Sequence, residues 1–432
     1  MEWWILIAIF TGLLAFMFLG IPISISLGFM AWLLILIFWG PKALYIFATT
    51  AYGKTNSFIL TAVPLFLIMA DFITHSGMSE DAYKMLRRWI GHIPGGLAVA
   101  SELGCTLFAS VNGGSTTTTA IMGKIAVPEM LNSGYDKRLA TGSIAAGGAL
   151  GVLIPPSVLM ILYGVMTETS VGHLFMGGII PGLMLSAMFI AYILVYCMIK
   201  PSKGPPVTGV SWQERWQSLW RILPVLLLGM FMLIAIYTGI CTPTELAGVG
   251  AFVALLIGLC YRRYTWTKFR NALLGTARTT SFILWILVGA VAFGSILSYL
   301  QIPQSLCQWV QGLEVSPYVI LVGINTMLIL MGCMMDPAGI IMLTAPILAP
   351  LIDSLGFDPL WFGVMFVVNM ELAEITPPLG LNLYVMKGIA PSEVELNDVL
   401  IGAMPFMVLD VIGLLLIIAF PQLVTWLPSN MY

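Results

Sequence analysis

Long apolar runs dominate the hydrophobic pattern of the chain. A bilayer core is crossed by about 20 consecutive apolar residues in a helix. Runs of roughly this length predict eight membrane spans, at about 3–20, 22–40, 57–76, 174–199, 220–240, 244–261, 279–300 and 399–427. The first of these runs lacks the basic start and small-residue cleavage site of a signal peptide, so we interpret it as a span.

Two further apolar runs, 138–164 and 360–387, are interrupted by the proline pairs Pro155-Pro156 and Pro377-Pro378. Proline removes a backbone donor and breaks the helix that precedes it. Irregular backbone at membrane depth persists only where it is buried in protein or lines a cavity. We therefore expect two broken helices that border a functional site.

Two more apolar segments, 96–130 and 318–352, are long enough to enter the membrane and return on the same side. Their polar interruptions predict re-entrant helical hairpins with tips near Gly113 and Asp336. Amphipathic arms are expected at 41–56 and 263–278. The aromatic and basic residues around the second arm favour contact with membrane lipid.

The prolines that interrupt the apolar segments recur at one spacing. Pro155 and Pro377 are 222 residues apart, as are Pro128 and Pro350. This single offset favours an internal repeat over chance matching. We predict a first repeat at 1–210 and a second at 223–432, joined by a polar linker at 200–217. Five crossings in each repeat would invert the second relative to the first.

The basic residues support that inverted arrangement. With the N-terminus outside, Lys42 and Lys54 are external and Lys124 lies within a hairpin. Cytoplasmic loops attract Lys and Arg, and fifteen of them then lie inside. They are Lys84, Arg87, Arg88, Lys137, Arg138, Lys200, Lys203, Arg215, Arg221, Arg262, Arg263, Lys268, Arg270, Arg278 and Lys387.

Composition agrees with an all-α polytopic membrane protein. Of 432 residues, 59% are hydrophobic and 9% charged. The six cysteines and three histidines have no metal-ligand spacing, so a transition-metal site is not expected. A phosphate-binding GxxxxGK[ST] loop and an HExxH motif are both absent, which argues against ATP hydrolysis and against an intramembrane enzyme. We expect no nucleic-acid partner.

The broken segments suggest ion chemistry. A helix that ends within a membrane exposes carbonyl groups, which attract a cation. The helix that follows exposes N–H groups, which attract an anion. The first tip supplies oxygen atoms, and residues 151–156 face it with free carbonyls. Oxygen ligands of this kind suit a hard monovalent ion such as sodium.

In the second repeat, Asp336 is the carboxylate nearest to a hairpin tip, facing residues 376–380. A carboxylate at membrane depth is costly, so we expect it to bind an ion or solute, although it also fits a helix cap before Pro337. We expect Glu102 and Lys124 to pair across the first hairpin. Glu371 and Glu374 share a helical face. We assign no role to these two residues, or to Asp71 and Asp410.

Four motifs resemble the large membrane subunit of tripartite ATP-independent periplasmic (TRAP) transporters. They are SVNGGSTTTTAIMGKIAVPEM, AAGGALGVLIPPS, MMDPAGIIMLTAPILAPL and ITPPLGLNLYV, in this order along the chain. The resemblance implies an elevator-type, sodium-driven importer of an organic acid such as a sialic acid or a C4-dicarboxylate. It also implies two partners, a small four-helix-type membrane subunit and a periplasmic substrate-binding protein.

By position, the resemblance implies one sodium ion at the first break and another at the second. The implied sodium ligands are Asn112, Ser115, Gly151, Leu153, Pro156, Asp336, Thr376 and Leu379, and the implied solute contacts are Gly114, Ser157 and Asp336. Gly114 replaces a serine that is frequent in the family, so one hydroxyl is missing. A self-sufficient sodium/dicarboxylate symporter of similar design is the alternative.

Overall fold

The computed structural model describes residues 8–9, 11–13, 15–16, 19–207 and 209–431. Half of the span predicted at 3–20 lies outside the described residues. All regular structure in the described part of the chain is helical, which confirms the predicted all-α class. Seven of these helices are long and apolar enough to cross a membrane.

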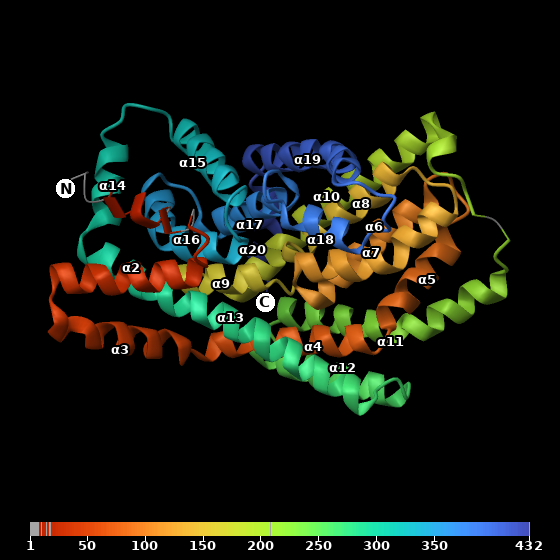
Figure 1. Cartoon of the computed structure of the whole chain (residues 1–432), viewed down its shortest axis with the longest axis horizontal. Coiled ribbons are helices and arrows are strands. Elements are labelled where there is room, and N and C mark those ends of the chain that lie inside the picture. The colour runs from red at the N-terminus through yellow and green to blue at the C-terminus, as the bar shows by residue number, and fades with distance from the viewer. Residues whose placement is uncertain (1–7, 10, 14, 17–18, 208, 432) are drawn as a thin grey trace.

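One group of helices lies along one side of the molecule (Figure 1). They are α2 (Ile23–Phe38), α3 (Leu44–Thr55), α4 (Ala62–His75), α11 (Trp212–Tyr237), α12 (Pro243–Cys260) and α13 (Trp266–Tyr299). Helix α13 packs against α2, α3 and α4, and α12 packs against α4 and α11. We call this group the frame.

The remaining long helices form a second body (Figure 1). They are α6 (Gly96–Asn112), α7 (Ser115–Asn132), α8 (Lys137–Ala149), α9 (Val158–Thr167), α10 (Val171–Ile199), α15 (Pro317–Gly332), α16 (Pro337–Ser354), α17 (Pro359–Ile375), α18 (Leu381–Ile389), α19 (Leu396–Ala419) and α20 (Gln422–Ser429). Helix α8 packs against α6, α7 and α19. We call this group the core body.

Short elements connect the two groups. Helix α5 (Met78–Ile90) contacts α11 of the frame and α6 of the core body, and α14 (Ile302–Gln311) contacts α13 and α16. The 3-10 turns are η1 (Pro41–Ala43), η2 (Phe58–Thr61), η3 (Leu150–Val152) and η4 (Pro201–Lys203).

The structure contains both predicted hairpins and both predicted breaks. Helices α6 and α7 form the first hairpin and α15 and α16 the second, while α8–α9 and α17–α18 are each interrupted at a proline pair. Helix α7 begins at Ser115 and ends at Asn132; α16 begins and ends 222 residues later. The helix boundaries therefore recur at the offset found in the sequence.

Three predicted boundaries are wrong. The arm at 263–278 and the span at 279–300 are one helix, α13, because no proline interrupts residues 266–299. The span at 399–427 divides into α19 and α20 at Phe420, which precedes Pro421 and leaves the helical conformation. The linker ends early, since α11 starts at Trp212, where Ser211 and Glu214 form a capping box.

The connector between α7 and α8 is fixed by Asp136. Its side chain accepts hydrogen bonds from the N–H groups of Arg138 (2.9 Å) and Leu139 (3.4 Å) and pairs with the ammonium of Lys203. Burial alone would raise the pKa of Asp136, but the hydrogen bond and charge of Lys203, together with the two N–H groups, hold this pKa below its ordinary value.

The Asp136→Asn variant is expected to lower the melting temperature modestly at neutral pH. A carboxyl whose pKa is lowered by folding stabilises the folded state above its unfolded pKa and loses that effect as pH falls through the folded pKa. Asparagine keeps a capping oxygen but removes the charge. Thermal unfolding in detergent should show the two proteins converging in acid; an equal difference at both pH values would contradict the role of the charge.

Candidate functional site at the helix breaks

The first hairpin tip rests on the first proline pair. Helix α6 ends at Asn112, Gly113 adopts a left-handed conformation (φ 62°), and α7 begins at Ser115. A Cβ atom at Gly113 would lie 2.5 Å from the carbonyl oxygen of Pro156, which is too close for any side chain. Only glycine fits this contact.

Hydrogen bonds fix the polar groups of the first tip. The Asn112 amide donates to the Gly114 carbonyl and to the Thr118 hydroxyl, both at 3.3 Å, and Thr118 donates to the same carbonyl at 2.8 Å. The Ser115 hydroxyl exchanges hydrogen bonds with the side-chain amide of Asn382 in α18, at 2.7 and 2.9 Å. The two hairpin arms are therefore joined to each other at the tip, and α7 is also tied to the second repeat through Ser115.

The first break is completely buried. Residues 151–160 are all buried. The Ser157 hydroxyl donates to the Val152 carbonyl and accepts from the Met160 N–H at 3.3 Å, so it caps α9. A Cβ atom at Gly151 would lie 2.9 Å from the Gly114 carbonyl oxygen. Tip and break are thus in direct contact through backbone oxygens.

The structure brings most of the predicted first-site residues together. Asn112, Gly114 and Ser115 lie on the tip, and Gly151 and Pro156 lie on the facing break. The carbonyl of Leu153 instead points towards α10, where it lies 2.6 Å from the position of a Cβ on Gly178.

At the second tip, Asp336 caps α16 with both carboxylate oxygens. They accept from the N–H groups of Ala338 (3.1 Å) and Gly339 (3.0 Å). The N–H of Leu379 donates to the Cys333 carbonyl at 3.3 Å, which joins this tip to the second break. The Thr376 hydroxyl donates to the Leu372 carbonyl at 2.6 Å. The helix-cap interpretation of Asp336 is confirmed.

The second break opens into a cavity of about 480 Å³. Core-body residues Cys333 to Asp336, Pro378 and Leu379 line one side, and residues 20–23 with Phe282 line the other. A cavity of this size can hold a small organic solute. Of the three implied solute contacts, Asp336 lines this cavity, whereas Gly114 and Ser157 do not.

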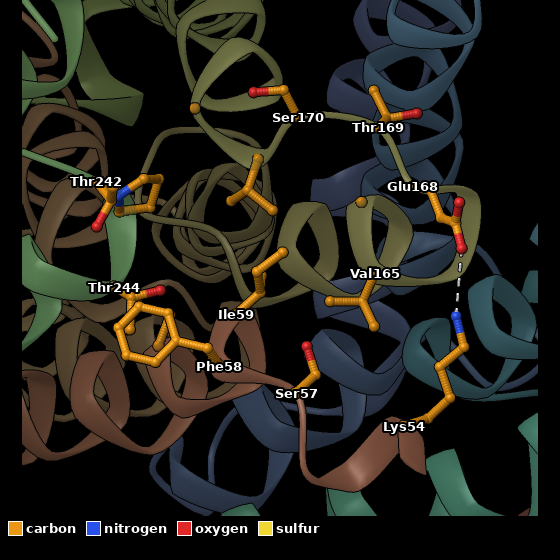
Figure 2. A pocket seen from close by; sticks show the side chains of 15 residues that line it. Lys54, Ser57, Phe58, Ile59, Val165, Glu168, Thr169, Ser170, Thr242 and Thr244 are labelled. Atoms are coloured by element: carbon orange, nitrogen blue, oxygen red, sulfur yellow. Dashed lines mark ion pairs between the residues drawn. The ribbon is translucent and has the colours of Figure 1, made fainter. Parts of the chain in front are cut away.

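A second cavity of similar volume lies near the end of α9, shown in Figure 2. Lys54 of α3 and Glu168, just after α9, face each other across it at 3.6 Å. Its other polar lining is made of hydroxyl groups, which come from Ser57, Thr169, Ser170, Thr242 and Thr244. None of the predicted site residues lines this cavity.

Sequence reasoning missed the residues that connect the two tips. Asn382 is fully buried and donates to the Ala145 carbonyl (3.1 Å) as well as to Ser115. The carboxyl of Glu374 lies beside the Ser115 hydroxyl and within electrostatic reach of Asp336. A buried amide in an apolar helix was the available signal, because such a group requires partners.

The predicted pairing of Glu102 with Lys124 is wrong. Glu102 is fully buried and neither of its carboxylate oxygens has a hydrogen-bond partner, while Lys124 is exposed. Equal depth in a hairpin does not place two side chains on facing sides of its helices.

The Asn382→Ala variant is expected to weaken transport and to destabilise the fold. It leaves the buried Ser115 hydroxyl and the Ala145 carbonyl without their partner, which costs about 1–3 kcal/mol for each buried polar group. Uptake assays and thermal unfolding in detergent measure both effects. Uptake and melting temperature equal to wild type would contradict the assigned connection.

A helical membrane protein whose hairpin tips meet helix breaks belongs, by this architecture, to the secondary transporters. Residues 10–423 match the family described as "Tripartite ATP-independent periplasmic transporter, DctM component". The chain belongs to this family. It is therefore a large permease of the inner membrane that carries an organic acid by secondary transport, and not an enzyme.

Curated relatives belong to the same family, and a solved structure shares the fold. The C4-dicarboxylate TRAP transporter large permease protein DctM of Pseudomonas aeruginosa is 36% identical over 94% of both chains. The sialic acid large permease SiaM of Vibrio cholerae is 30% identical over 97% of both. The YdaH transporter of Alcanivorax borkumensis has a similar fold, with a TM-score of 0.69 at 14% identity over 89% of this chain and 90% of that one.

Proposed function

We propose that this permease imports an organic acid by sodium coupling, and that a periplasmic binding protein delivers the solute. The observation that carries the proposal is the meeting of each hairpin tip with a helix break, the first through Gly113 and Pro156, the second through Cys333 and Leu379. Paired breaks of this kind offer cation and anion positions in the same place.

Sodium fits the first break on chemical grounds. The groups around it are the amide of Asn112, the hydroxyl of Ser115 and backbone carbonyls, which are neutral oxygen ligands. Soft thiolate or imidazole ligands, which transition metals prefer, are not part of this set. Asp336, Thr376 and Leu379 would hold a second sodium ion at the open break.

The solute would enter through the cavity beside Asp336. This cavity lies between the frame and the core body, so movement of one body against the other would change its access. Ser157 is buried at the first break and would reach the solute only when that break opens, whereas Gly114 is partly exposed on the tip. This arrangement supports an elevator movement of the core body, with the two repeats inverted relative to each other.

Two partners fit the comparisons. The isethionate TRAP transporter permease protein DctMQ of Oleidesulfovibrio alaskensis is 33% identical, and the chain spans only 60% of its length. The remainder of that protein has room for the small membrane subunit, which we propose as a separate partner of this chain. The binding protein is the second partner, and membrane lipid would contact the basic arm at the start of α13.

The substrate class follows from the relatives' range, which includes C4-dicarboxylate, sialic acid, diketogulonate and ectoine permeases. A C4-dicarboxylate or a sialic acid is our first expectation. A self-sufficient sodium/dicarboxylate symporter is the second candidate, favoured by the presence of both breaks in one chain.

Uptake into proteoliposomes separates these candidates. The permease is reconstituted with its small subunit, and uptake of each labelled acid is followed with and without an inward sodium gradient and with and without the binding protein. We expect uptake only when both are present. Sodium-driven uptake without the binding protein would favour the symporter. Uptake that does not depend on the sodium gradient would contradict sodium coupling.

A further inference from the structure

Three carboxyl groups in the interior of the core body have no partner. Glu102 of α6, Glu371 of α17 and Asp410 of α19 are each fully buried, and all six of their carboxylate oxygens lack hydrogen bonds. Helices α6, α17 and α19, which carry these groups, all pack against α8, and α17 also packs against α19, so the carboxyls are close enough for their charges to interact. The three groups therefore form one cluster, which we call the carboxyl cluster.

Nothing in the described chain compensates three negative charges there. On α8, Lys137 and Arg138 pair with Asp398, twelve residues and thus about 18 Å before Asp410 along α19. Arg87 of α5 pairs with Glu129, and Lys387 of α18 donates to the Val394 carbonyl. The titratable neighbours are Glu374 and the thiol of Cys105, which add no positive charge.

A further unpartnered polar group faces the cluster. The carboxyl of Glu102 fills the place that a side chain on Gly147 of α8 would take. Ser143 precedes Gly147 by one helical turn and so faces the same side. Its hydroxyl is buried and has no hydrogen-bond partner. The site therefore contains six carboxylate oxygens and one hydroxyl group. It has too few hydrogen-bond donors to stabilise ionised carboxylates.

Protonation would supply the missing hydrogen-bond donors and remove the uncompensated negative charge. An unpaired carboxylate in a membrane interior neutralises rather than remain charged, and neighbouring carboxyls reinforce this. No group of acidic, histidine or cysteine residues among the described residues has the geometry to hold a metal ion. A neutral carboxyl brings its own O–H donor and needs no cationic partner.

We infer that Glu102, Glu371 and Asp410 form a proton-binding site within the core body, distinct from the two helix breaks, and that transport requires this site to be protonated. Loss of a proton to water at alkaline pH would leave a buried negative charge and stop the movement of the core body. The functional half of this inference rests on the proposed transport function; the protonation itself does not.

Infrared spectroscopy of the purified protein tests protonation directly, without any transport assay. Glu371→Gln and Asp410→Asn are each expected to remove intensity from the carbonyl band of protonated carboxyls at neutral pH. The control Glu245→Gln, at an exposed capping box of α12, should remove intensity only from the carboxylate band. Loss from the carboxylate band in the cluster variants, or a cluster band that shifts when sodium is removed, would overturn the inference in favour of ionised groups or a bound cation.

The pH profile of uptake tests the functional half. A triple variant with Glu102→Gln, Glu371→Gln and Asp410→Asn keeps the cluster neutral at every pH. We expect wild-type uptake to fall at alkaline pH and the triple variant to keep its neutral-pH rate there. An alkaline decrease of equal size in both proteins would overturn the requirement for protonation. If the triple variant fails to fold, Glu371→Gln alone should still reduce the alkaline decrease.

Discussion

Replacing Gly113 with alanine is expected to abolish sodium-dependent uptake. The new Cβ would lie 2.5 Å from the Pro156 carbonyl oxygen, so the first tip must move away from the break. Displacement of ligands by about 1 Å can cost roughly 100-fold in a positioned site. Uptake at several sodium concentrations should show a large loss that high sodium does not restore.

Gly356 provides the matched control for this variant. It has a similar left-handed backbone (φ 81°), but nothing lies within 4 Å of a Cβ placed there. Gly356→Ala should therefore cost only the backbone strain, about 1 kcal/mol of stability, and retain uptake. Equal uptake by the two variants would show that the contact between tip and break is not needed.

The Asp336→Ala variant is expected to fold and to lose most sodium-dependent uptake. A hydrogen bond to a charged group is worth about 1.5–3 kcal/mol, which corresponds to roughly 10- to 100-fold weaker sodium binding. The cavity beside the second break would keep its shape but lose its carboxylate. Sodium-dependent uptake in proteoliposomes measures this loss, with melting temperature as the test of folding.

Asp358→Ala controls for the loss of a helix cap. Asp358 precedes Pro359 and accepts from the Leu360 N–H at 2.8 Å, so it caps α17 as Asp336 caps α16. This variant loses about 1 kcal/mol of capping energy but no proposed ligand. Uptake near wild type in Asp358→Ala, with loss in Asp336→Ala, is the expected contrast. Undiminished uptake in Asp336→Ala would remove its assigned role.

Residues that end or cap helices explain why much of the fold could be predicted from the sequence. A glycine between polar residues, an adjacent proline pair and an Asp-Pro pair favour turns or helix caps, so the tips and breaks at Gly113, Pro156 and Asp336 follow from their positions. The continuous helix α13 was missed because a change from polar to apolar composition does not end a helix when no proline or glycine cap interrupts it.

Contacts between distant segments could not be predicted in the same way. Asn382 is 267 residues from Ser115, and no local pattern indicates that the two side chains meet. Glu102 and Asp410 are brought together by the packing of α6, α8 and α19, so neither carboxyl could be given a role from its own surroundings in the sequence. The spacing within the first hairpin suggested Lys124 as the partner of Glu102, but Lys124 is exposed and Glu102 is buried.

Coupled flux of sodium and solute tests the central claim most directly. Radiolabelled sodium and a labelled organic acid are followed together in proteoliposomes that contain the permease, its small subunit and the binding protein. We predict that sodium enters with the acid at a fixed ratio and that Gly113→Ala abolishes both fluxes while Gly356→Ala retains both. Acid uptake without accompanying sodium would contradict the assignment of cation sites to the helix breaks.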